Sequence, residues 1–354
     1  MATIKELKEL ALHAARGTAP ANYSVGTVDE ALRGELASMC GSINNFMRNR
    51  YDIYDIIIAT ADEIVPNRVI EVMGTFAEIR QVPQGQKAIF KRGMVGRNRA
   101  KKFLTQVGLA GVYETFRLDN ETFEMGAYAV GGAATIDFER FLDGVENMAD
   151  LMDILTEGLT DAVFGEVQKA LIAARDAVGR PSANKVISNE FESDKMFELV
   201  STVKAYGGAA VIFAAPEFIG AMGPDAIVPV GIAGSQAVYH PDDINAIHNS
   251  GYVNVFRGTP IVQIPQSFVD EKNEQTVINP QFAYVLPAGK EKIVKVVFEG
   301  ETQVYDWVNK DQSMEINVYK KMGAAILTHH NWGIYWNTSI PNYSDIQVEP
   351  DVDE

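Results

Sequence analysis

The sequence predicts an α+β fold, and two observations carry that prediction. One long stretch, from about residue 145 to residue 177, places apolar residues at helical spacing, and the final third of the chain mostly has the composition and alternation of strands. A third observation separates the chain from an ordinary globular protein, because a basic, glycine-bearing window over 79–113 follows neither pattern.

Composition limits the possible classes. With 354 residues, of which 47% are apolar and 22% charged, the chain has room for one large or two interleaved domains. Its formal charge of −16 argues against tight binding of nucleic acid by the folded body, since phosphates are repelled. The one cysteine, Cys40, has no intramolecular disulfide partner, which favours a reducing compartment. The start MATIKELKEL has no apolar core of a signal peptide. The most apolar stretch, 205–223, is interrupted by Pro216 and Glu217, so no membrane span is expected.

The first ninety residues are predicted to pass from helix to strand. Residues 2–16 form a short amphipathic helix, which either docks on its own domain or acts as an arm that packs on a partner. Residues 27–48 again have helical periodicity. From 51 to 90 the segments IVPNRVIEVM and IRQVPQGQKAIF predict β-rich structure, with a turn at Pro83-Gln84-Gly85 between two extended pieces.

The long helix over about 145–177 has clear ends. Asp143 is placed to cap it, and Gly179-Arg180-Pro181 ends it. Its apolar positions recur at helical spacing: Val145, Met148, Leu151 or Met152, Leu155, Leu159, Val163, Val167 and Leu171. Acidic residues fill its first turns and basic residues its last, which the helix dipole favours. Such a helix is roughly 50 Å long, which suits a flat or elongated subunit.

The remainder is predicted to mix short helices with strands. We expect a helix over about 194–206, an apolar strand AAVIFA, and a further helix that begins at Pro216-Glu217. KIVKVVF and TQVYDWVN are predicted to form a hairpin around Glu299-Gly300-Glu301, and SMEINVY alternates as a strand. The acidic tail VEPDVDE is expected to stay solvated.

The basic window 79–113 is the strongest functional signal. It contains no Asp or Glu, and its charge of +8 leaves −24 for the rest of the chain. Its bases are Arg80, Lys87, Lys91, Arg92, Arg97, Arg99, Lys101 and Lys102. A nucleic-acid-binding loop would interleave aromatic residues for stacking, and only Phe90, Phe103 and Tyr113 occur. A loop that lies on the acidic surface of a neighbouring copy fits better, and a solvated basic hairpin is the third alternative.

No catalytic or metal-binding constellation is found in the sequence, so we predict no enzyme activity, no cofactor and no metal. Gly289-Lys290 lacks the other residues of a nucleotide-binding loop. His329-His330 are adjacent, and neighbouring residues of a strand point to opposite faces. A lone Cys40 in an amphipathic helix is typical of a small hydrophobe, and Asp242-Asp243 after Pro241 is typical of a turn or helix start.

Four segments in this order resemble the major capsid proteins of tailed bacteriophages, which have the Hong Kong 97-like fold. VPQGQKAIFKRG is similar to the strand that enters the family's extended loop, and DFERFLDGVENMADLMDIL to the entry into its spine helix. FRGTPIVQIP resembles the family's Gly-x-Pro-Val-Val segment in the axial domain, and GAAILTHHNWGIYW its closing strands. The resemblance extends from about Ile53 to Trp336 and rests on order and spacing.

The resemblance implies a division of the chain. An N-terminal arm would cover 1–50, a peripheral domain 51–90 and 120–190 with the spine helix at about 145–177, and an extended β-hairpin loop 91–119. An axial domain would cover 191–265, strands shared by both domains 266–345, and the acidic tail 346–354. The extended loop would contact neighbouring subunits through Lys91, Arg92, Arg97, Arg99, Lys101 and Lys102.

The function that the resemblance implies is a major capsid protein of the virion, assembled in the host cytoplasm. Copies would form hexamers and pentamers of an icosahedral head around double-stranded DNA, without sequence-specific binding and without a membrane. A separate scaffolding protein is expected, because only about fifty residues precede the β-rich start; the alternative is that the chain is already a mature form, and Met1 favours the first. A portal protein is a further expected partner. The alternatives are a nanocompartment shell of the same fold around an enzyme cargo, and a nucleic-acid-binding protein that uses the basic window.

Overall fold

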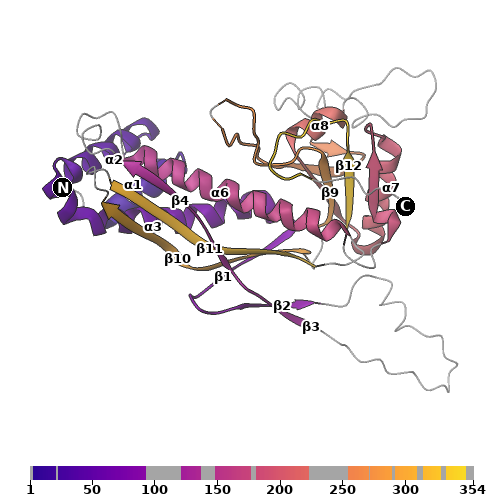
Figure 1. The fold of residues 1–354 in the computed structure, drawn as a ribbon, viewed down its shortest axis with the longest axis horizontal. Helices are drawn as coiled ribbons and strands as arrows, with labels where there is room; N and C mark the ends of the chain where they lie inside the picture. The colour runs from indigo at the N-terminus through magenta and orange to yellow at the C-terminus, as the bar shows by residue number, and fades with distance from the viewer. Residues whose placement is uncertain are drawn as a thin grey trace.

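The protein is described by a computed structural model. The described residues are 3–20, 23–92, 121–136, 148–176, 181–222, 254–270, 272–288, 292–308, 314–327 and 332–347. They form an elongated molecule: long helices lie along a sheet of long strands, a second sheet with shorter helices forms the other end, and a thin two-stranded ribbon projects from the first sheet (Figure 1). None of the described helices is long and apolar enough to span a bilayer.

Three helices begin the chain: α1 (Ile4–Ala15), α2 (Val25–Cys40) and α3 (Ile43–Met73). Thr3 and Glu6 form a capping box at the start of α1. Leu7, Leu10 and Ala11 are buried in the main core, and Lys8 forms an ion pair with Asp55 of α3 at 2.5 Å. Of the two alternatives for this helix, the structure shows the first, a helix docked on its own domain.

The β-rich prediction for the region after residue 51 is wrong up to residue 73. These residues continue α3, which also runs through the boundary expected at residue 50. The buried positions recur at helical spacing: Ile53, Ile56, Ile57, Ala61, Ile64, Val65, Val69 and Met73. Packing of this apolar stripe outweighs the strand preference of Ile and Val, and the helix accommodates the buried Pro66, which cannot donate a backbone hydrogen bond.

The first sheet has four strands in the order β1-β10-β11-β4. Their bounds are β1 Ala77–Val82, β10 Val294–Val308, β11 Met314–Ile326 and β4 Tyr128–Ile136. β1 is parallel to β10, and the other pairs are antiparallel. The helix predicted over 145–177 is present as α6 (Met148–Ala173), followed by the short 3-10 helix η1 (Ala174–Asp176), and α6 lies beside α3 along this sheet (Figure 1).

The predicted hairpin around Glu299-Gly300-Glu301 is also wrong. β10 continues through these residues, and its pairing with β11 shifts register between Glu299 and Gln303. Gly300 has φ +68°, which only glycine adopts readily. The segment is therefore a β-bulge rather than a turn. Pairing with β11 on both sides of the bulge keeps the strand continuous, and the predicted alternating strand at SMEINVY is confirmed within β11.

The second sheet has six strands in the order β5-β12-β9-β6-β8-β7. Their bounds are β5 Lys185–Ser188, β12 Gly333–Asn337, β9 Phe282–Pro287, β6 Ala210–Ala214, β8 Thr259–Gln263 and β7 Val255–Phe256. The predicted helices and strand at 194–222 are confirmed as α7 (Ser193–Gly207), β6 and α8 (Pro216–Met222). The 3-10 helix η2 (Ser182–Asn184) precedes β5. Strands from the last third of the chain thus contribute to both sheets.

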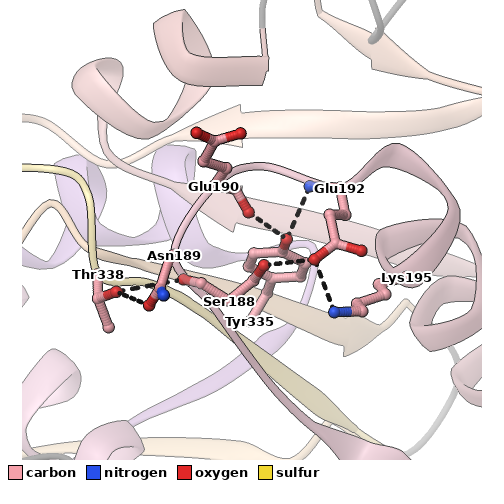
Figure 2. Close-up of polar contacts among 7 residues, drawn as sticks. All are labelled: Ser188, Asn189, Glu190, Glu192, Lys195, Tyr335 and Thr338. Atoms are coloured by element: carbon pink, nitrogen blue, oxygen red, sulfur yellow. Dashed lines mark hydrogen bonds and ion pairs between the residues drawn. The ribbon is translucent and has the colours of Figure 1, made fainter.

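A polar corner connects β5, α7 and β12 in this second part (Figure 2). The hydroxyl of Tyr335 accepts a hydrogen bond from the backbone N–H of Glu192 at 2.9 Å and donates to the backbone carbonyl of Glu190 at 3.1 Å. The Glu192 carboxylate in turn accepts hydrogen bonds from Ser188 and Lys195, each at 2.6 Å. These bonds satisfy the backbone where the chain leaves the edge strand and starts α7, and they fix the helix on the sheet.

Candidate assembly site

The basic window begins on a two-stranded ribbon that projects from the first sheet (Figure 1). β2 (Ala88–Arg92) pairs antiparallel with β3 (Glu121–Met125), from Ala88 opposite Met125 to Arg92 opposite Glu121. Lys91 is exposed on β2. Of the six predicted contact residues, the structure places only Lys91 and Arg92, both at the outer end of the described ribbon. Arg97, Arg99, Lys101 and Lys102 lie outside the described residues.

A tight turn leads from β1 into this ribbon. The backbone N–H of Gln86 donates to the carbonyl of Pro83 at 3.1 Å, and Gly85 has φ +81°. A positive φ at the third residue is the geometry of a type II turn, which glycine favours. The turn predicted at Pro83-Gln84-Gly85 is confirmed.

Phe90 anchors the ribbon to the sheet. Its side chain is fully buried among Ala88, Met125 and Val297 of β10, and its ring stacks on Phe123 with 5.5 Å between centroids. The guanidinium of Arg80 lies 4.6 Å from the centre of the Phe90 ring. A buried aromatic ring under a cation is a specific contact, so the base of the ribbon has a defined position on the sheet.

Glu78 pairs with two cations, Arg80 and Lys295, beside this anchor. Its carboxylate accepts a hydrogen bond from Nε of Arg80 at 2.8 Å and a short one from the ammonium of Lys295, whose side chain is only 3% exposed. Burial alone would raise the pKa of Glu78, but the hydrogen bonds from Lys295 and Arg80 outweigh it and lower that pKa below its ordinary value. The buried ammonium of Lys295 therefore has an ionised counter-charge.

Pairing with acidic residues reduces the excess positive charge of the window. Arg80 pairs with Glu78, and Lys87 lies 3.3 Å from Glu124 on β3. Both acids lie outside the range 79–113 counted in the sequence, Glu78 directly before it and Glu124 beyond its end. Glu78 could have been found, because it is two residues from Arg80 and shares its face of the strand. Glu124 could not, because the pairing of β2 with β3 sets that contact.

A second exposed feature, which the sequence does not predict, is a small hairpin formed by 267–270 and 272–277. Phe268 and Val269 are 56% and 58% exposed. The Asp270 carboxylate accepts hydrogen bonds from the backbone N–H groups of Gln275 at 2.8 Å and Glu274 at 3.0 Å. These bonds lower the pKa of Asp270. Two apolar side chains are thus held out to solvent on a structured loop.

The described part of the chain holds no group of three or more His, Cys, Asp or Glu side chains that could bind a metal. His329-His330, Asp242-Asp243 and the side chain of Cys40 lie outside the described residues. An open groove of about 350 Å³ between β5 and α7 is lined by Lys185, Lys195 and Glu198 among others. Lys195 already pairs with Glu192, and we assign no chemistry to this groove.

Exposed apolar side chains such as Phe268 and Val269 are typical of a surface that contacts another protein. The sequence model of the family described as "SPbeta prophage-derived putative capsid protein YonB" matches residues 22–336. Since the match covers well over half of the chain, the protein belongs to this family of prophage-derived capsid proteins. The predicted function, a capsid protein of the virion, is confirmed. No curated protein matches the sequence.

Solved structures of several shells are similar to the chain. The capsid of cyanophage P-SCSP1u has 11% identity and a TM-score of 0.47, and the similarity covers 75% of this chain and 87% of that one. The mature capsid of bacteriophage PhiM1 has 10% identity and a TM-score of 0.44, with 75% and 87% covered. The holo-SrpI encapsulin complex from Synechococcus elongatus PCC 7942 has 17% identity and a TM-score of 0.42, with 78% and 89% covered. Because these values are low, the identification rests on the family match.

Proposed function

We propose that this chain is the major subunit of an icosahedral phage head and that its copies form the hexamers and pentamers of that shell. The observation that carries the proposal is the family match over residues 22–336. The ribbon supports it, because β2 and β3 form a separate two-stranded sheet that projects from the body (Figure 1).

In this proposal residues 91–102 of the basic window, called the basic segment below, contact the acidic surface of a neighbouring copy. The contact residues would be Lys91, Arg92, Arg97, Arg99, Lys101 and Lys102. Complementary charge sets register and orientation at an interface more than it adds affinity. Exposed carboxylates suited to such a contact occur on α3, at Glu71, and on α6, at Glu157. The contact should therefore weaken with salt.

The proposed domains correspond to the two sheets except at β5 (Lys185–Ser188), which pairs with β12 in the second sheet although its residues fall in the proposed peripheral domain. Residues 191–265 would form the axial domain at the capsomer centre, 51–90 and 120–190 the peripheral domain, and 266–345 would supply strands to both. All four strands β9 to β12 lie within 266–345. β10 and β11 belong to the first sheet, and β9 and β12 belong to the second, which supports the proposal that 266–345 supplies strands to both domains. A separate scaffolding protein and a portal protein complete the set of proposed partners.

The head would enclose double-stranded DNA without sequence-specific contacts. The net charge of −16 supports this role, because a strongly acidic lining does not adhere to packaged DNA. DNA that co-purifies with particles, protected from nuclease, would support the proposal. A protein cargo in its place would indicate a nanocompartment.

Electron microscopy of the purified protein tests the assembly. Closed shells, tubes or rings are expected, and a variant in which Arg97, Arg99, Lys101 and Lys102 are replaced by Glu should stay folded and form none. A matched variant with four exposed bases elsewhere, Lys5, Arg48, Arg68 and Lys169, replaced by Glu should still assemble. Normal shells from the first variant would refute the role of the basic segment, and salt-sensitive DNA binding by the unassembled subunit would favour a nucleic-acid-binding protein.

A further inference from the structure

The bulge of β10 lies where β1 leaves the first sheet. The last pair in the register of β1 with β10 joins Val82 to Glu299. The chain then turns at once, and β2 begins at Ala88. The direction in which the ribbon leaves the sheet is therefore decided at the turn that faces this bulge.

Glu299 contacts the turn and the sheet together. Its carboxylate accepts a hydrogen bond from the backbone N–H of Gly85 at 2.9 Å. The ammonium of Lys321, the residue opposite Glu299 in the register of β10 with β11, lies 3.6 Å from the same oxygen. The Glu299 side chain is only 13% exposed. The carboxylate is thus held by a cross-strand cation while it accepts a charge-assisted bond from the turn.

The backbone of the bulge touches the same turn. A Cβ atom added at Gly300 would lie 3.1 Å from Cβ of Gln84, closer than side chains ordinarily pack. The turn therefore lies directly on the bulge. Glu299 is one of several attachments of the described ribbon: the Phe90 cluster is another, and the guanidinium of Arg80 donates a hydrogen bond to the carbonyl of Ile89 at 2.7 Å. Attachments at separate points define the direction of a two-stranded ribbon, whereas a single one would let it pivot.

We propose that Glu299 is a positioning residue that sets the direction of the ribbon by holding Gly85 and so aims the basic segment at a second copy of this chain. The inference rests on the proposed function for its second half, the contact between copies. Its first half, the attachment of the turn to Glu299, concerns the single subunit. The two halves can be tested separately.

Amide hydrogen exchange of the unassembled subunit tests the attachment. In Glu299→Ala, exchange in a peptide that contains Gly85 is expected to rise about tenfold, because the N–H loses a bond to a charged acceptor. Glu299→Gln should give a smaller rise, since its amide oxygen can still accept. Glu301→Ala is the matched control: it removes the same charge from the same bulge at an exposed side chain, and exchange at Gly85 should not change. Unchanged exchange in both Glu299 variants would overturn the attachment.

The same three variants test the consequence for assembly. Particles of Glu299→Ala are expected to show a broadened range of diameters or a loss of closed shells, with normal particles from Glu301→Ala. Faster exchange at Gly85 with unchanged particles would overturn the aiming role. If instead charge reversal of the basic segment leaves shells intact, the proposed contact fails, while the exchange result still decides the attachment of Glu299.

Discussion

The carboxylate of Asp62, in α3, accepts hydrogen bonds from both the backbone N–H and the hydroxyl of Thr302, at 2.9 and 2.6 Å. Thr302 lies in the bulge of β10, and the register shift turns it toward the helix. The ammonium of Lys320 on β11 also contacts Asp62, and its side chain is 5% exposed. The bulge therefore joins three elements: α3 through Thr302, β11 through its pairing, and the ribbon turn through Glu299.

Replacing Asp62 by Ala should destabilise the subunit by about 3–5 kcal/mol, because it leaves the ammonium of Lys320 buried without its counter-charge. The free energy of unfolding from a denaturant titration measures the effect. The double variant Asp62→Ala, Lys320→Met should recover much of the loss, since no buried charge remains.

Asp55→Ala is the matched control for this prediction. Asp55 lies on the same helix and pairs with Lys8, but its side chain is 57% exposed. An exposed pair contributes only about 0–1 kcal/mol. A similar loss of stability in Asp55→Ala and Asp62→Ala would show that the buried network is not the cause.

The ion pair between Glu78 and Lys295 should make the subunit sensitive to acid. The folded state lowers the pKa of Glu78, so its contribution to stability is fully present above the unfolded value of about 4.3. The contribution is lost as the pH falls from there through the lowered folded pKa. The difference in unfolding free energy between the wild type and Glu78→Gln should therefore shrink as the pH falls below about 4. A difference that stays constant from neutral to acid pH would contradict this assignment.

The sequence predicted well those elements whose apolar pattern and end signals agree. α6 has a long apolar stripe, and α7 ends at Gly207 and Gly208, so both were found close to their observed positions. α3 is not predicted over its full length, because its Ile and Val residues locally favour a strand and Pro66 disfavours a helix interior, whereas packing against α1, α6 and the sheet stabilises the helix. Glu299-Gly300-Glu301 has the composition of a turn, and the pairing of β10 with β11 on both sides of it makes it a bulge instead.

The site was predictable only in part. Segregated charge along the chain singled out the segment that starts on the ribbon, and its contact with a neighbouring copy stays a prediction. The residues that hold the ribbon come from far along the sequence: Glu299 is 214 positions from Gly85, and Lys295 is 217 positions from Glu78. Counting charges within one window cannot find such partners, because strand order in the sheet brings them together.

Replacing both Phe268 and Val269 by Ser should impair assembly without destabilising the subunit. Both side chains are more than half exposed, so their loss should change the unfolding free energy by no more than about 0.5 kcal/mol. In a shell, burial of these two apolar side chains against a neighbouring copy would stabilise the contact between copies. Light scattering of assembly, with the denaturant midpoint of the subunit measured alongside, checks both parts.

Lys272→Ser is the control on the same hairpin, because Lys272 is exposed and polar. It should assemble as the wild type does. Wild-type assembly by the Phe268, Val269 double variant would remove this hairpin from the set of contacts between copies.

Two adjacent glycines in β4 should respond in opposite ways to the same substitution. A Cβ at Gly131 would lie 2.2 Å from the carbonyl oxygen of Val318 and 2.5 Å from Cβ of Tyr319, both on the neighbouring strand β11. A Cβ at Gly132, by contrast, would meet no atom within 4 Å. Gly131→Ala should therefore push the two strands apart and cost about 1–3 kcal/mol. Gly132→Ala should be neutral or stabilise by roughly 0.5–1 kcal/mol, because alanine loses less backbone entropy on folding. Equal unfolding midpoints for the two variants would mean that β4 does not pack against β11 as closely as this register requires.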